Sequence, residues 1–300
     1  MSIYHYEVYG LGIESSIYFP ELEPKKRNKD VHIHFDSGKS CFSNAPEKKS
    51  FGIFSKVLYG PKDAGYLHDR KPLFRVKNGK EIIVNSCTRL NKSLLRGMIL
   101  NQAMGILFHQ RGHLILHANA IDMAGGVVAF LGGQGVGKST TTFSLINSGY
   151  SLVTDDVLTI DPLKNNIPHV IPSYPRIKLW GDVIKHSGND SESIHKIHPN
   201  SDKYYYSLED HFSPKPLPLK IIYVLGKGCK NEIISLNSQD ATIELVRHLY
   251  SPWLISFSEQ SRILLNCANI VKSVPIKRLN ICHSLDDLEN LVEIIKKDKK

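Results

Sequence analysis

The octapeptide GGQGVGKS at residues 132–139 constrains the fold of this chain more than any other feature, because it matches the pattern G-x-x-x-x-G-K-[ST]. An apolar run, Val127–Leu131, precedes it directly, and a helix-compatible stretch follows it as far as Ser148. A P-loop requires this order of strand, glycine-rich loop and helix. The sequence therefore predicts an α/β domain that carries a phosphate-binding loop at the end of a strand.

The residue types in this loop suit the phosphates of a nucleoside triphosphate. Glycines let backbone N–H groups approach a phosphate closely, and the dipole of the following helix favours an anion at its start. We expect Lys138 to reach the β- and γ-phosphates and Ser139 to hold Mg²⁺ through its hydroxyl. The predicted ligands are ATP, or another nucleoside triphosphate, and Mg²⁺. The predicted nucleotide-binding set is Gly132, Gly133, Gln134, Gly135, Val136, Gly137, Lys138, Ser139 and Thr140.

Two adjacent carboxylates, Asp155 and Asp156, are the second chemical feature. Gly149 is a natural helix stop, and the apolar strand that follows it ends at this pair. In a β-helix-β crossover the two strands are parallel, so their ends reach the same edge of the sheet. Neighbouring residues on a strand face opposite sides, which predicts different roles. One carboxylate would hold Mg²⁺, and the other would accept the proton of an attacking hydroxyl.

Regions on either side of this core differ in pattern. Apolar runs at 3–9, 31–35, 53–59 and 81–84, separated by turn-forming clusters, predict a β-rich module over residues 1–88. His32 and His34 share one face of such a strand, and the pair alone indicates a solvent-facing strand rather than a metal site. A helical run at 91–109 predicts a bridging helix within 89–112, followed by a catalytic domain over 113–300.

The stretch 161–216 is rich in Pro, His, Ser and Asn, and only one helix is expected in it, at 178–186. Arg176 and Lys203 are candidates for phosphate or acceptor contacts, although each would also be ordinary as a surface residue. Trp180 is expected in the core. Beyond this stretch the pattern predicts strands at 220–225, 232–236 and 274–279 and helices at 239–250, 258–271 and 284–297.

Composition narrows the class of protein. Apolar residues make up 41% of the chain, and no apolar run approaches the about 18 residues that a membrane span needs. The start of the chain does not have the pattern of a secretory signal, so we expect a cytoplasmic protein without a membrane partner. The net charge of +9 fits a polyanionic ligand, although part of it lies in an expected surface loop at Lys25 and Lys26. Aromatic residues are not interleaved with basic ones, so nucleic acid is not the expected partner. The five cysteines show no CxxC spacing, which indicates neither a disulfide framework nor a zinc site.

Residues 116–160, LHANAIDMAGGVVAFLGGQGVGKSTTTFSLINSGYSLVTDDVLTI, resemble the catalytic domain of the HPr serine kinase/phosphorylase family. That family shows a histidine-bearing strand, a hairpin, the glycine-rich loop, a helix and a strand ending in Asp-Asp, and the phosphoenolpyruvate carboxykinase superfamily shares a related architecture. The resemblance implies an α/β core of this type, ATP-dependent phosphorylation of a hydroxyl, and a homo-oligomer. It implies His117 near the γ-phosphate, Lys138 at the phosphates, Asp155 as base and Asp156 as metal ligand.

Other parts of the chain depart from that family. Its second signature, Glu-Ile-Arg-Gly, is replaced here by YPRIKLW at 174–180. This segment and YGLGIESSIYFPELEP at 9–24 look like the shorter HPr-kinase-like proteins of bacterial peptide-biosynthesis clusters. Some of those phosphorylate a serine of a ribosomal precursor peptide, as in lasso peptide maturation. This second resemblance implies a serine-bearing peptide or protein as the acceptor.

Four functions fit these patterns. The first is a serine kinase acting on a peptide or protein, and the second is a bifunctional HPr kinase/phosphorylase with the same site. The third is a small-molecule kinase or carboxykinase-like enzyme, and the fourth is a nucleotide-dependent binding module. We favour a kinase because binding phosphate alone does not require a base, whereas Asp155 and Asp156 offer one.

Overall fold

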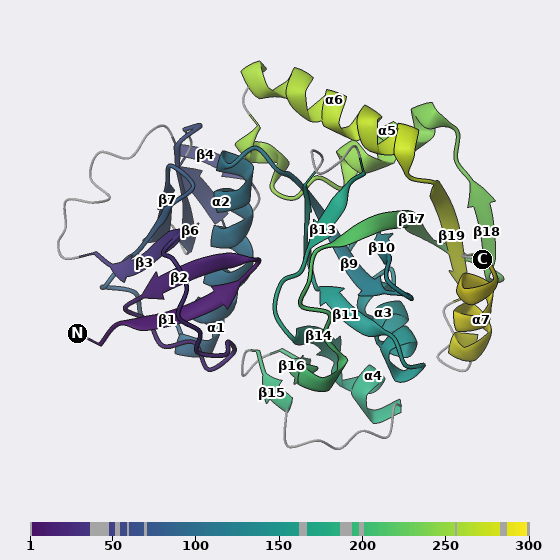
Figure 1. Ribbon diagram of the computed structural model, residues 1–300, viewed down its shortest axis with the longest axis horizontal. Coiled ribbons are helices and arrows are strands. Elements are labelled where there is room, and N and C mark those ends of the chain that lie inside the picture. Colours follow the sequence, from purple (N-terminus) through teal and green to yellow (C-terminus); the bar gives the residue numbers. More distant parts are fainter. Residues whose placement is uncertain are drawn as a thin grey trace. The chain divides into compact units, whose positions relative to one another are not determined.

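The computed structural model describes residues 2–36, 48–51, 55–58, 60–68, 71–161, 167–186, 194–197, 201–255, 257–282 and 287–298. The chain forms two compact units (Figure 1). The first comprises Met1–His113 with Ser251–Gln260, and the second comprises Leu114–Tyr250 with Ser261–Lys300. The architecture is mixed α/β, as predicted. No helix among the described residues is both long enough and apolar enough to cross a membrane.

The first unit is built on one eight-stranded sheet with the order β1-β2-β3-β8-β7-β6-β5-β4. Neighbouring strands pair antiparallel, except for the parallel pairs β2–β3 and β3–β8. On β3, Val31 and Ile33 are buried while His32 and His34 face the other side, which is the alternation expected of a half-buried strand. The strands are β1 Tyr4–Val8, β2 Leu11–Ser15, β3 Val31–Phe35, β4 Lys48–Phe51, β5 Ser55–Leu58, β6 Asp63–His68, β7 Lys71–Lys77 and β8 Glu81–Val84.

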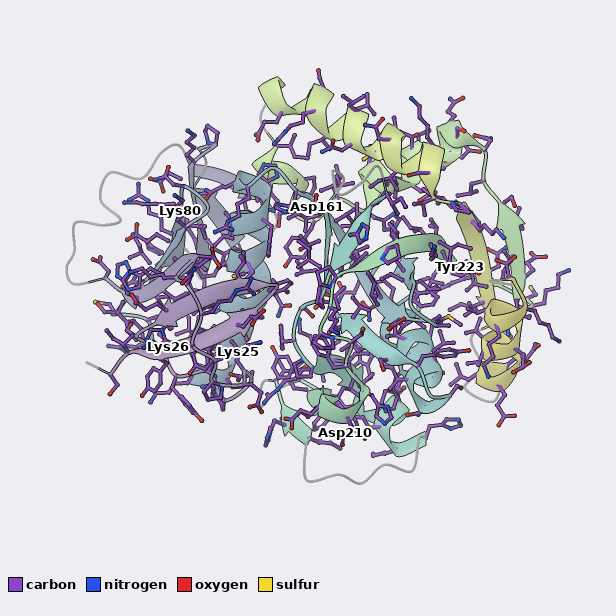
Figure 2. All side chains as sticks on the ribbon, in the orientation of Figure 1. Lys25, Lys26, Lys80, Asp161, Asp210 and Tyr223 are labelled. Carbon is purple, nitrogen blue, oxygen red and sulfur yellow. The ribbon has the colours of Figure 1, made fainter. Side chains whose placement is uncertain are left out.

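The predicted helical run is present but not uniform. It consists of α1 Lys92–Met98, a π-helical segment Ile99–Ala103 and α2 Met104–Gln110. The side chain of Asn91 accepts a hydrogen bond from the backbone N–H of Ser93 and caps the start. At the surface of the same unit, Lys25 and Lys26 are exposed as expected (Figure 2), and Lys25 Nζ lies 2.6 Å from Glu7 Oε2.

The second unit is organised around β9 Leu114–Asp122. This strand pairs antiparallel with β10 Val127–Leu131, β11 Ser151–Thr154 and β12 Val157–Asp161. Because β10 and β11 are both antiparallel to β9, they run parallel to each other, as predicted, with β9 between them. The end of β10 and the end of β11 therefore reach the same edge of the sheet, which is where the glycine-rich loop and the aspartate pair begin.

The remaining strands complete this sheet. The order is β10-β9-β12-β13-β17-β19-β18, and β10 also pairs parallel with β17, so the pairings from β10 to β17 close into a ring. The long β17 makes this closure possible because it pairs in turn with β13, β10 and β19. The bounds are β13 His169–Ile171, β17 Leu217–Gly228, β18 Glu232–Ser235 and β19 Ile276–Cys282.

Helix α3, Lys138–Asn147, carries the residues that follow the loop and packs its apolar side into the core of the second unit. Phe143 is buried and meets Tyr206 edge-on with ring centroids 5.1 Å apart. Phe130 stacks on Tyr223, whose hydroxyl donates to Asp298 Oδ2 at 2.6 Å, and Tyr223 is labelled in Figure 2. Burial of each such ring stabilises the fold by about 1.5–3 kcal/mol.

A three-stranded antiparallel sheet, β14-β16-β15, packs against this core. Its first strand occupies residues for which the sequence predicts a helix. The helix expected at 178–186 begins only at α4, Gly181–His186, because residues 176–180 form a strand. Ile177 and Leu179 alternate into the core, which is a strand period rather than a helix period. Trp180 is 43% exposed and so is not the core residue that was expected. The strands are β14 Arg176–Trp180, β15 Ile194–Lys196 and β16 Lys203–Ser207.

The other helices match the sequence pattern closely. Asn237 caps the start of α5 by accepting a hydrogen bond from the backbone N–H of Asp240 at 2.9 Å. Helix α7 buries Leu291 and Ile295 in the same core that receives Phe143. The bounds are α5 Ser238–Arg247, α6 Phe257–Ser273 and α7 Leu288–Asp298, with short 3₁₀ turns at Glu209–His211 and Pro252–Leu254.

Replacing Phe143 tests this packing. Phe143→Ala removes a buried ring that joins α3 to β16, so the free energy of unfolding should fall by about 3–5 kcal/mol. Urea denaturation followed by circular dichroism measures the change. The control is Leu265→Ala, which truncates a side chain that is 60% exposed on α6 and should cost less than about 0.5 kcal/mol. Equal losses in the two variants would contradict the placement of Phe143 in the core.

Candidate functional site

The glycine-rich loop connects β10 to α3 through backbone conformations that side chains do not tolerate. Gly132 has φ +154° and Gly137 has φ +110°. A Cβ on Gly132 would lie 2.6 Å from Val136 Cγ1, and a Cβ on Gly137 would lie 2.8 Å from Ile281 Cδ1. Both positions therefore favour glycine because of their positive φ, and at Gly132 the space for a side chain is limited as well.

Lys138 begins α3, and its ammonium group folds over the loop. Its Nζ donates to the carbonyl oxygens of Gly132 at 2.7 Å and Gly133 at 3.2 Å. Burial lowers the pKa of Lys138, and the negative charges of Asp156 and Asp155 oppose that shift. The lysine thus places a cation where the loop would receive the phosphates, at the N-terminus of a helix.

Asn119 on β9 links the loop to the aspartate pair. Its side chain is fully buried, and its Nδ2 donates to Ser139 Oγ at 3.3 Å. Its Oδ1 accepts from the backbone N–H of Asp156 at a long 3.5 Å. The two residues predicted to hold Mg²⁺, Ser139 and Asp156, are therefore joined to opposite ends of one buried amide.

The acidic pair forms a turn between β11 and β12 rather than a straight strand end. Asp156 has φ +66°, in the left-handed region, and the backbone N–H of Val157 donates to Asp155 O at 2.8 Å. The prediction that the two carboxylates lie on opposite faces of a strand is therefore wrong, because both carboxylates accept hydrogen bonds from Lys178. Asp155 Oδ2 accepts from the backbone N–H of Lys178 at 3.0 Å, and Asp156 Oδ2 accepts from Lys178 Nζ.

Burial and charge push the two carboxyl groups in opposite directions. Burial, together with the negative charge of Asp156, raises the pKa of Asp155 to about 7. Burial also acts to raise the pKa of Asp156, but the charge and hydrogen bond of Lys178 and the nearby His117 hold this pKa well below the usual range. Burial acts to lower the pKa of Lys178, but the negative charge of Asp156 outweighs burial. The pKa of Lys178 therefore lies well above its ordinary value. Two carboxyl groups with separated pKa values suit two different tasks.

Access to the two carboxyl groups also differs. Asp155 is buried, and its Oδ1 receives no hydrogen bond from the described residues. The side chain of Asp156 is 27% exposed and lies next to His117, whose Nε2 is 3.6 Å from Asp156 Oδ1. His117 and Asn119 are two residues apart on β9 and so share a face of that strand.

The two basic candidates of the irregular stretch lie on the β14–β16 ladder. Lys203 pairs with Trp180 across the strands, and its Nζ is 4.7 Å from the centroid of the Trp180 ring. The positive charge of Lys203 partly offsets the rise in the pKa of Asp155 that burial causes, so Lys203 interacts electrostatically with the acidic pair. Arg176 is on the same strand as Lys178, two residues before it, and therefore on the same face.

The structure thus brings together Lys138, Ser139, Asp155, Asp156 and His117 as the sequence predicted. Sequence reasoning missed Asn119 and Lys178. Asn119 could have been found from its strand register, because it follows His117 by two residues. Lys178 was missed because the sequence pattern predicts a helix at 178–186, whereas Lys178 lies on the strand β14.

These features define a candidate phosphate-binding site of the P-loop class with an acidic pair beside it. No protein-family model matches the chain. The chain is homologous, at low identity, to HPr kinase/phosphorylases. It is 27% identical over 158 residues to that of Thermoanaerobacter sp. strain X514, with 45% of this chain and 52% of the relative covered. It is 31% identical over 116 residues to that of Caldanaerobacter subterraneus subsp. tengcongensis, with 33% and 38% covered.

This chain spans about half the length, or less, of the curated relatives that it matches. Among solved structures, the Hpr(Ser) kinase/phosphatase from Coxiella burnetii aligns with 62% of this chain and 95% of its own, at 12% identity. The TM-score of that alignment is 0.34.

Substitution of Lys138 tests the phosphate-binding site directly. Lys138→Met removes the cation above the loop and should weaken ATP binding at least about tenfold, which is about 1.4 kcal/mol. Isothermal titration calorimetry measures the affinity. Lys185→Met, at an exposed lysine of α4, is the matched control and should leave the affinity unchanged. An unaltered ATP affinity in Lys138→Met would mean that the loop does not hold the phosphates.

Proposed function

We propose that this protein is an ATP-dependent serine kinase that transfers the γ-phosphate to a hydroxyl of a peptide or protein. The observation that carries the proposal is Asp155, a buried carboxyl with a pKa near 7. Hydrogen bonds through Lys178, Asp156 and Asn119 connect it to Ser139 at the end of the phosphate loop. Binding phosphate alone does not need such a group, whereas proton removal from a hydroxyl near neutral pH does.

The residues at the loop suit ATP with Mg²⁺. Backbone N–H groups of the loop and the ammonium of Lys138 would hold the β- and γ-phosphates. Ser139 Oγ and the Asp156 carboxylate offer the oxygen ligands that Mg²⁺ prefers, and Asn119, which bonds to the Ser139 hydroxyl and to the backbone N–H of Asp156, would keep the two residues adjacent. When bound, Mg²⁺ would neutralise charge on the transferring phosphoryl group.

Proton transfer is assigned to Asp155. The acceptor hydroxyl would lose its proton to Asp155 as its oxygen bonds to the γ-phosphorus, and the bond to the β–γ bridging oxygen would break to release ADP. Lys178 keeps Asp156 ionised, so that Asp156 remains a metal ligand rather than a second acid. His117 Nε2 lies 3.6 Å from Asp156 Oδ1, so His117 would orient that carboxylate beside the γ-phosphate.

Two observations bear on the acceptor. The sequence YPRIKLW, which resembles peptide-cluster kinases, forms β14 and the residues before it and carries Lys178 into the site. We therefore propose a serine of a ribosomal precursor peptide of the lasso type as the acceptor, with Arg176 and Lys203 as basic contacts on the same small sheet. The second candidate is the HPr protein, because the relatives over the catalytic segment are named HPr kinase/phosphorylases.

A mass-spectrometric assay tests the function. Wild type and Asp155→Asn are incubated with ATP, Mg²⁺ and a panel that holds HPr, hydroxylated metabolites and any precursor peptide encoded beside the gene. We expect one phosphate on a serine of the peptide, with the rate lowered about 10²–10⁴-fold in the variant. Asp210→Asn, at an exposed acid of the second unit (Figure 2), should retain the wild-type rate.

The alternative outcomes of this assay are distinct. Phosphate on HPr, and its release by inorganic phosphate, would favour the bifunctional enzyme instead. A phosphorylated metabolite would favour a small-molecule kinase. Undiminished activity in Asp155→Asn would exclude Asp155 as the base and leave Asp156 as the next candidate.

The pH dependence of the reaction follows from the raised pKa of Asp155. The base must be ionised, so kcat/KM should rise with pH up to about 7 and level off above it. Asp155→Asn should lack this rise in its residual activity. A profile that is already level above about pH 5, as for an ordinary carboxyl group, would contradict the proposed role.

A further inference from the structure

The outer face of the N-terminal sheet places two imidazoles and a carboxylate together. His32 and His34 lie on one face of β3, and β8 pairs parallel with β3 so that Glu81 is opposite His32. One ligand atom from each of the three side chains lies within 4.8 Å of the other two. The backbone register of two hydrogen-bonded strands fixes this spacing.

Both ring nitrogens of His34 have polar neighbours. Its Nδ1 lies 3.1 Å from the carbonyl oxygen of Phe35, which accepts a hydrogen bond from Nδ1 when that nitrogen carries the proton. Its Nε2 then faces Glu81 Oε1 at 2.9 Å, and that oxygen is also an acceptor when the carboxyl group is ionised. With the proton on Nδ1, His34 Nε2 and Glu81 Oε1 both offer lone pairs on the same side of the sheet, which is the arrangement that a metal ion binds.

A metal ion satisfies this geometry in the way that histidine sites commonly do. A ligating histidine usually donates its other N–H to a backbone carbonyl or a carboxylate, which fixes the ring, and Phe35 O provides that acceptor here. Tetrahedral zinc places its ligand atoms about 3.3 Å apart. His34 Nε2 and Glu81 Oε1 are 2.9 Å apart, and one ligand atom from each of the three side chains lies within 4.8 Å of the others, so the spacing is comparable with that of a zinc site.

We propose that His32, His34 and Glu81 bind a divalent transition-metal ion, for which Zn²⁺ is the best fit. Two imidazole nitrogens and one carboxylate oxygen are a ligand set typical of Zn²⁺, and they leave a fourth position for water or a further ligand. Mg²⁺ and Ca²⁺ prefer oxygen ligands, so this site differs in metal preference from the phosphate loop.

Glu14 extends the cluster on the next strand. It lies opposite His32 on β2, and its Oε1 is 3.7 Å from His32 Nε2. Lys29 Nζ donates to the same carboxylate at 2.9 Å, which orients it. All three proposed ligands are partly exposed, so an ion can reach them from solvent. The bound ion would link β3 to β8, and it would lie close to Glu14 on β2.

Zinc binding by the full chain tests the proposal. Metal-free protein is titrated with Zn²⁺ by calorimetry in an excess of Mg²⁺, which occupies oxygen-only sites. We expect one Zn²⁺ to bind per chain at this site and to raise the melting temperature, because binding to the folded state alone stabilises it. The variant His32→Ala/His34→Ala should bind at least about tenfold more weakly and lose the thermal shift.

Matched variants separate this site from other histidines. His195→Ala/His211→Ala removes two exposed imidazoles elsewhere in the chain and should bind Zn²⁺ as the wild type does. Glu81→Gln keeps the shape of the third ligand without its charge and should weaken binding while circular dichroism stays unchanged. The proposal is overturned if the wild type does not bind Zn²⁺, or if His32→Ala/His34→Ala binds it as tightly as the wild type.

Discussion

The buried amide of Asn119 is the interaction on which the candidate site depends. It donates to Ser139 at the start of α3 and accepts from the backbone of Asp156 in the β11–β12 turn. A buried amide is costly to leave unpaired, so this side chain holds the two elements together. Because β9 also pairs with β10, β11 and β12, the strand that presents Asn119 positions both the loop and the turn.

The chemistry of the site follows from unequal neighbours of two adjacent aspartates. The Lys178 ammonium donates to the Asp156 carboxylate, whereas the Asp155 carboxylate accepts from the backbone N–H of the same residue. Asp156 is therefore held as a carboxylate, while burial leaves Asp155 with a pKa near 7. One lysine thus gives the two carboxyl groups different pKa values, which suits the separate tasks of metal ligand and base that we propose for them.

Local patterns predicted the parts of the site that lie close together in the chain. The glycines and Lys138 of the loop, the helix after it and the strand before the aspartates all follow from short-range rules of spacing and conformation. The parallel course of β10 and β11 also followed, because a β-helix-β crossover leaves few alternatives. The prediction failed at 178–180, where apolar residues fit either period and pairing with β16 decided for a strand.

The sequence by itself determined which chemical groups are present and that the loop and acidic pair share one sheet edge. Tertiary structure decided which distant groups join them. Lys178 reaches Asp156 only because β14 lies against the turn, and Glu81 reaches His34 across 47 positions only because β3 and β8 are neighbours. The physical reason is that strand order and register are set by burial of the whole core, which no short stretch of sequence encodes.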